Sequence, residues 1–146
     1  MKKLYLDMNI YNRPFDDQSQ VRIRLETVAI HGVLKAVKEN KFMLLWSFML
    51  DFENSMNPFE DIRTEIEMAS SLATVTVGAA DDILRIAMDY ERSGIKPRDA
   101  IHLACALKGK AEFFITCDDR LIKKAGLMKD NIIAMNPVDF VREEMK

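Results

Sequence analysis

The feature that most constrains the fold of this chain is the alternation of short apolar runs with longer amphipathic segments. Each short run is rich in aliphatic, β-branched or aromatic residues and is bounded by polar residues, which is typical of a buried strand. We therefore predict strands at residues 3–6, 42–46, 73–77, 112–116 and 131–135.

The segments between these runs have the spacing of amphipathic helices. In the first of them, apolar residues recur every three or four positions from Val21 to Val37, and we expect the helix to stop at Asn40. Several segments open with proline or a capping residue. The predicted helices span residues 20–39, 47–57, 58–71, 79–92, 97–108, 119–124 and 137–144.

Strands that alternate with helices imply parallel βαβ units, whose right-handed crossovers place helices on both faces of one sheet. We predict an α/β fold, a three-layer α/β/α sandwich with a central, mostly parallel sheet of four to five strands. The chain has 146 residues, of which 49% are hydrophobic, enough for one core. We therefore expect residues 1–146 to form a single domain.

Composition excludes several classes of protein. The net charge of −2 gives no broad basic field, so any site for a polyanion must be local. The longest apolar stretch, residues 42–50, is far shorter than the roughly 20 residues that cross a bilayer. No glycine-rich phosphate loop is present, which argues against a nucleotide cofactor. A charge follows the first apolar run too early for a signal peptide, so we expect a cytoplasmic protein with Cys105 and Cys117 as reduced, buried thiols.

Two of the predicted strands end in aspartate. Asp7 follows the first strand and Asp118 follows the fourth. Ligands of open parallel sheets bind beyond the carboxyl ends of the strands, so the two carboxylates share one edge if these strands are neighbours. Taken singly, each aspartate could instead cap the helix that follows it.

Two further acids are candidates for the same site. Asp99 lies in the first turn of helix 97–108, where its alternative role is a favourable interaction with the helix dipole. Glu53 lies among large apolar side chains, and Asp51, two positions away, would face another side of the helix. We favour Glu53. We expect His102 to be a hydrogen-bonded packing residue rather than a catalytic one.

Four carboxylates brought together repel one another unless they take up protons or meet a cation. Oxygen ligands without a convergent set of histidines and cysteines select Mg²⁺ or Mn²⁺ over zinc. The sequence therefore predicts a site for Mg²⁺ or Mn²⁺, with one or two ions.

Four short motifs resemble, in their order and placement, those of the PIN domain family as found in VapC-type toxins: Leu6-Asp7-Met8-Asn9, Glu53, Asp99-Ala100-Ile101-His102-Leu103-Ala104 and Thr116-Cys117-Asp118-Asp119. The resemblance covers nearly the whole chain. It implies a metal-dependent ribonuclease whose acidic quartet is Asp7, Glu53, Asp99 and Asp118. Asn9 and Thr116 match polar positions that support the site in this family, and Asp119 is expected to cap a helix. The family glutamate is usually followed by aliphatic residues, whereas Asn54 and Ser55 follow Glu53.

In the reaction that the resemblance implies, the ion activates a water for attack on an RNA phosphodiester. A basic rim around the acids would hold the phosphates, and we assign substrate binding to Lys96, Arg98, Arg120 and Lys123. Lys124, Arg13, Arg22 and Arg24 could extend this rim.

Partners and rival functions remain open at this point. A toxin would have an antitoxin that covers its acids, and a homodimer could form through Phe48, Phe52, Met56 and Phe59, which core packing explains equally well. The main rival is a non-catalytic PIN-like module that binds RNA or a partner. A phosphoaccepting receiver-like domain and a phosphatase with Asp7 as nucleophile fit less well, the latter because position 9 is Asn.

Overall fold

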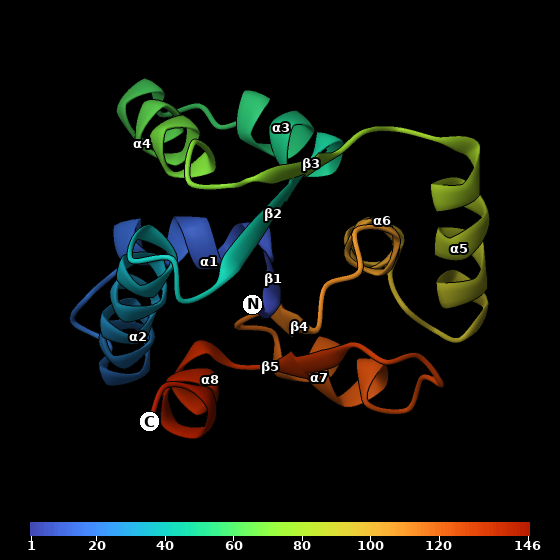
Figure 1. The fold of residues 1–146 in the computed structure, drawn as a ribbon. Coiled ribbons are helices and arrows are strands. Elements are labelled where there is room, and N and C mark those ends of the chain that lie inside the picture. Colours follow the sequence, from blue (N-terminus) through green and yellow to red (C-terminus); the bar gives the residue numbers. More distant parts are fainter.

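A single five-stranded parallel sheet forms the centre of the computed structural model, which describes all 146 residues (Figure 1). The strand order is β3-β2-β1-β4-β5, so the first strand of the chain lies in the middle of the sheet. The strands are β1 (Lys3–Leu6), β2 (Met43–Ser47), β3 (Val75–Val77), β4 (Phe113–Ile115) and β5 (Ile133–Met135).

Helices cover both faces of this sheet, which confirms the predicted three-layer α/β/α sandwich. Helices α1, α2 and α8 lie on one side, α6 and α7 lie on the other with α5 outside α6, and α3 and α4 lie toward the β3 edge (Figure 1). Their bounds are α1 (Met8–Asn12), the 3₁₀ helix η1 (Arg13–Phe15), α2 (Val21–Lys38), α3 (Phe48–Ser55), α4 (Glu60–Ser70), α5 (Asp81–Arg92), α6 (Pro97–Lys108), α7 (Asp119–Ala125) and α8 (Pro137–Glu144).

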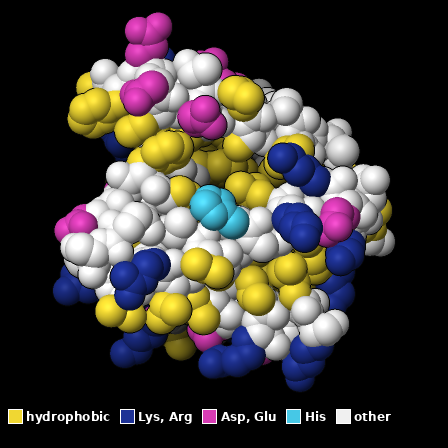
Figure 2. Space-filling view, turned by 90° about the vertical axis from the view of Figure 1, so that its left-hand side faces the viewer, with side chains coloured by type: hydrophobic (Ala, Val, Ile, Leu, Met, Phe, Trp, Pro, Cys, Tyr) yellow, Lys and Arg dark blue, Asp and Glu magenta, His cyan; other side chains and the backbone are white.

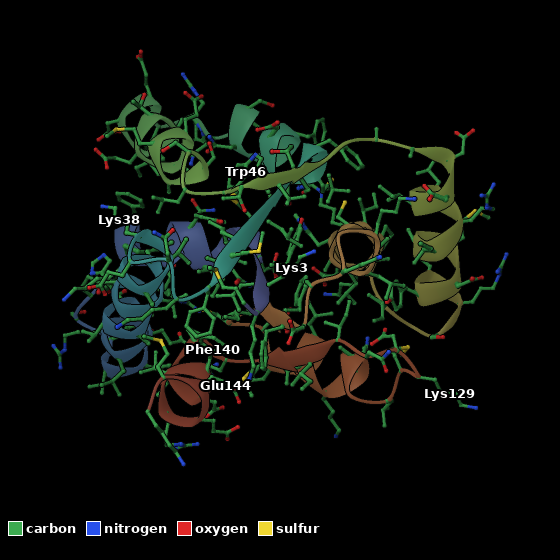
Figure 3. All side chains as sticks on the ribbon, in the orientation of Figure 1. Lys3, Lys38, Trp46, Lys129, Phe140 and Glu144 are labelled. Carbon is green, nitrogen blue, oxygen red and sulfur yellow. The ribbon has the colours of Figure 1, made fainter.

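The central strands are apolar because both of their faces are buried. Leu4, Tyr5 and Leu6 of β1 are fully buried, as expected for a parallel sheet with helices on both sides. The ring of Tyr5 stacks on that of Phe114 in the neighbouring strand, with ring centroids 5.4 Å apart. Phe140 of α8, also fully buried, lies between its helix and the sheet (Figure 3).

All five predicted strands and seven predicted helices are present, with ends shifted by up to two residues; helices α6 and α8 have the predicted bounds. The helix α2 ends at Lys38, and Asn40, its predicted stop, has the left-handed conformation common just after a helix, with a φ of 59°. Residues 8–15 lie outside the predicted strands and helices. They form α1 and η1, which are too short to show a helical period.

Hydrophobic side chains also remain at the surface. On the side of the molecule formed by α2 and α4, they gather in the hollow between these two helices (Figure 2). No helix combines the length and apolar character that crossing a membrane requires.

The α8 helix is anchored by one aromatic cluster, which gives a test of the packing. The centroid of the Phe140 ring lies 5.3 Å from the ring centroid of Phe42 and 5.2 Å from that of Phe113. Phe140→Ala should lower the free energy of unfolding by about 3 to 5 kcal/mol, because it removes a buried ring and leaves a cavity. Urea denaturation measures this. Phe52→Ala, at a side chain that is 51% exposed, is the control and should change stability by no more than about 0.5 kcal/mol. Equal effects of the two would contradict the packing of α8.

Candidate functional site

The pairing of β1 with β4 brings Asp7 and Asp118 to the same edge of the sheet. The two strands are adjacent and parallel, with Leu6 opposite Ile115. The backbone N–H of Asp7 donates to the carbonyl of Ile115 at 2.9 Å, so the pairing continues to the acid itself. The sequence prediction that the two carboxylates share an edge depended on this adjacency, and the strand order confirms it.

Asp7 is buried and accepts hydrogen bonds from three donors. Its side chain is 5% exposed, and Oδ1 accepts from the backbone N–H of Met8 at 2.8 Å, so Asp7 caps α1. Oδ2 accepts from the hydroxyl of Thr116 at 2.9 Å and from Nδ2 of Asn9 at 3.3 Å. Burial raises the pKa of Asp7, while the nearby His102 and these hydrogen bonds favour its ionised form.

Asn9 and Thr116 connect the two loops that carry the acids. Nδ2 of Asn9 donates to the hydroxyl of Thr116 at 3.0 Å, and its Oδ1 accepts from the backbone N–H of Cys117 at 3.1 Å. The same hydroxyl accepts from the backbone N–H of Asp118 at 3.2 Å. Both residues predicted to support the site therefore lie against it.

Asp118 is the N-cap of α7. Its Oδ1 accepts from the backbone N–H groups of Arg120 and Leu121, at 3.0 and 3.1 Å. These bonds use one oxygen and leave the other available to a cation or a water molecule. The prediction that Asp119 is the cap is wrong. Asp119 is the first helical residue, and its carboxylate pairs with Arg22 at 2.9 Å, whose hydrogen bond lowers the pKa of Asp119.

Asp99 is electrostatically linked to both of these acids. It lies in the first turn of α6, beside the fully buried Ala100. Burial is the largest cause that raises the pKa of Asp99 to about 6, and the charges of Asp7 and Asp118 contribute to the same rise. The charges of Asp7 and Asp118 thus disfavour the ionised form of Asp99, which is the kind of repulsion that a divalent cation relieves.

Glu53 takes part in a different interaction. Its Oε1 pairs with Nε2 of His102, and its Oε2 lies 3.6 Å from Nη1 of Arg98. Nδ1 of His102 hydrogen-bonds the hydroxyl of Tyr5 at 2.7 Å, which in turn bonds Ser47 Oγ at 2.7 Å. His102 is 1% exposed, so the prediction of a hydrogen-bonded packing residue is confirmed.

Asp51, the alternative to Glu53, faces elsewhere. It is exposed and accepts a hydrogen bond from Nε1 of Trp46 at 2.7 Å. Glu53, by contrast, lies near enough to Asp7 for its charge to raise the pKa of that acid. Of the two candidates, Glu53 is the one directed toward the other acids.

The basic residues near the acids lie in three different places. Lys96, Arg120 and Lys124 line a small cavity of about 60 Å³ together with Asp99 and Asp118. Arg98 lies at another cavity beside Glu53, and Lys123 is exposed and lines neither of these two.

Arg13 and Arg22, predicted as extensions of the basic rim, are already paired. Both lie against the buried Glu26, with nitrogen to oxygen distances of 3.2 and 3.4 Å. Arg22 also donates to the carbonyl of Cys117 at 3.2 Å, next to Asp118. Arg22 therefore links α2 to the β4–α7 loop, and both arginines are engaged by carboxylates.

The residues fit a hard divalent cation in chemistry but are not gathered around one point. No three Asp, Glu, His or Cys side chains lie close enough together to hold a metal ion, and Glu53 is engaged by His102 and Arg98. The predicted convergence of all four acids on one ion is therefore absent from this geometry. Two features nevertheless suit a hard divalent cation. The available ligands are carboxylate oxygens, and the charges of Asp7 and Asp118 act on Asp99 with a repulsion that a cation would offset.

A parallel α/β domain with acidic side chains at the carboxyl edge of its sheet is the class that this fold and site define. The family model of the PIN domain matches residues 46–127, more than half of the chain. The chain belongs to the PIN domain family, which confirms the resemblance seen in its motifs. The match begins after Asp7, whose place in the site comes from the structure.

One similar solved structure supports the same fold. It is a chain from the crystal structure of VapBC2 from Rickettsia felis bound to a DNA fragment from their promoter. The TM-score is 0.62 at 13% sequence identity, and the alignment covers 92% of this chain and 98% of the other. A comparison with curated proteins found no match.

The raised pKa of Asp99 predicts how stability depends on pH. The pKa of about 6 in the folded state exceeds the value of about 3.9 in an unfolded chain, so ionised Asp99 opposes folding above pH 6, and this cost disappears as the pH falls toward 4. Asp99→Asn should therefore raise the free energy of unfolding at pH 7.5 in EDTA, by on the order of 1 kcal/mol after allowance for solvent screening. The gain should shrink at pH 4.5.

Urea denaturation at the two pH values measures this effect. Asp81→Asn, in the exposed first turn of α5, controls for the lost interaction with the helix dipole. A variant of Asp99 that is less stable than the native protein at pH 7.5 would refute the crowding of the acids.

Proposed function

We propose that this protein is a Mg²⁺- or Mn²⁺-dependent endoribonuclease that hydrolyses RNA phosphodiester bonds. The observation that carries the proposal is the electrostatic coupling of Asp7, Asp99 and Asp118 at one edge of the sheet. Membership of the PIN domain family supports it, because proteins of this family are generally nucleases that depend on divalent metals. The proposed unit is the whole of residues 1–146, acting as one domain in the cytoplasm.

Asp7, Asp99 and Asp118 are the residues that would hold the metal. When bound, the ion lowers the pKa of a coordinated water and offsets charge on the phosphate. The chain's own contribution is to orient the carboxylates: Thr116 and Asn9 fix Asp7, and the capping bonds fix Asp118. Glu53, held by His102, is the proposed fourth member, and it would orient the attacking water.

Lys96, Arg120 and Lys124 are the proposed phosphate contacts, because they border the cavity that contains Asp99 and Asp118. Cations beside an acidic site attract the backbone of a nucleic acid and determine its register. Arg98 would contribute once it separates from Glu53. Lys123 is proposed as a weaker contact at the periphery.

A toxin within a toxin–antitoxin pair is the proposed biological setting. The similar fold in the VapBC2 complex supports an antitoxin partner. A homodimer is also proposed. Of the exposed side chains considered for its interface, Phe52 is the candidate, because Met56 and Phe59 line the cavity beside Glu53. Phe48 is not, because it packs against the core.

Cleavage of labelled single-stranded RNA with Mn²⁺, Mg²⁺ or EDTA tests the proposal. The native protein should cut with either metal and not with EDTA. The double variant Asp7→Asn and Asp99→Asn should lose at least about 100-fold in rate, since the lost charge stabilisation is worth several kcal/mol.

A matched pair of substitutions tests the choice between the two acids of α3. Glu53→Gln should slow cleavage strongly, whereas Asp51→Asn should leave the rate within about twofold. Absence of cleavage with either metal, together with no binding of Mn²⁺ by calorimetry, would instead favour a non-catalytic binding module.

A further inference from the structure

A cavity of about 500 Å³ opens beside Glu53, between α1 and η1 on one side and the end of α3 and the start of α4 on the other. Met8, which directly follows Asp7, lines it, and so do Glu53 and Arg98. Its volume lies in the range of pockets that hold small molecules. We propose that this cavity, called the base pocket below, binds one unpaired nucleobase of the RNA strand. The inference rests on the proposed function.

The apolar part of the base pocket consists of side chains that are unusually exposed. Phe15, Met56 and Phe59 are 45%, 47% and 61% exposed, although each is large and hydrophobic. They come from η1, from the loop after α3 and from the residue before α4. Unpaired bases bind proteins by stacking on such aromatic rings, and the stacking is largely independent of sequence.

The polar part contains a buried acceptor that the chain does not satisfy. Asn54 is 4% exposed, and its Nδ2 donates to the carbonyl of Arg63 at 3.1 Å. Its Oδ1 has no hydrogen-bond partner in the protein. A buried acceptor without a partner costs free energy. The protein covers this oxygen, so a ligand N–H in the pocket would reach it only after the side chain of Asn54 turns toward the cavity. Every nucleobase carries an N–H group on its pairing edge.

The mixture of linings favours a base over an apolar protein segment. Beside Asn54, the pocket contains the amide side chains of Asn12 and Asn57 and the guanidinium of Arg98. Aromatic rings with amide and guanidinium groups are the chemistry that recognises bases in single-stranded RNA. A base within a duplex hides its pairing edge and both of its faces, so the pocket selects unpaired nucleotides.

The position of the pocket gives it a role in the choice of the cleavage site. Glu53 lines the pocket and is also paired with His102, which lies 3.9 Å from Asp7. A nucleotide whose base occupies the pocket would therefore have its phosphodiester at the acids. The base pocket thus selects which bond along a single strand is cut.

Fluorescence anisotropy with a labelled single-stranded RNA decamer, in EDTA so that no cleavage occurs, tests the inference. Phe59→Ala should raise the dissociation constant at least about fivefold, as expected for the loss of one stacking platform. Leu84→Ala is the matched control, because this large apolar residue is 54% exposed on α5 and does not line the pocket. It should bind within about twofold of the native protein. Duplex RNA should bind equally well to the native protein and to both variants.

The outcomes separate this inference from the proposed function. If the native protein binds and cleaves RNA, but Phe59→Ala and Phe15→Ala leave affinity for the single strand unchanged, the base pocket is refuted and the nuclease stands. An apolar segment of a partner protein would then be the remaining occupant. If the native protein neither binds nor cleaves RNA, both proposals fail together.

Discussion

The parallel pairing of β1 with β4 is the interaction on which the rest of this molecule depends. It places Asp7 beside Thr116 and brings the loops after the two strands within hydrogen-bonding distance. The side chains of Asn9 and Thr116 then connect the two loops to each other and to both acids. The position of these acids therefore depends first on the order of the strands in the sheet and only then on the individual side chains.

Two of the acids have a structural role that is compatible with the proposed metal binding. Asp7 and Asp118 both cap helices, the role that sequence reasoning gave as the alternative to metal binding. Capping does not exclude metal binding, because a carboxylate has two oxygens. In both residues the capping bonds use only Oδ1. The helix dipoles at these positions also favour the ionised form, which is the form that a cation needs.

The sequence was sufficient for the fold and for the location of the acids, but insufficient for their pairing. Buried parallel strands leave continuous apolar runs, so all five could be recognised, whereas α1 and η1 are shorter than any readable period. The pair between Glu53 and His102 joins residues 49 positions apart, and the bond of Tyr5 to His102 spans 97. Such contacts leave no local pattern in the sequence. Because His102 and Arg98 engage Glu53, the four acids lie in the predicted elements but do not converge on one point.

The central place of β1 in the sheet has a consequence for folding. The first strand must wait for β4, more than a hundred residues later, before its second edge is filled. Contacts of such long sequence separation form slowly, because the entropy of closing a large loop is lost before the contact can stabilise the chain. During synthesis at the ribosome, Asp7 is made long before Asp118, so the two acids come to the same edge of the sheet only after β4 has been made.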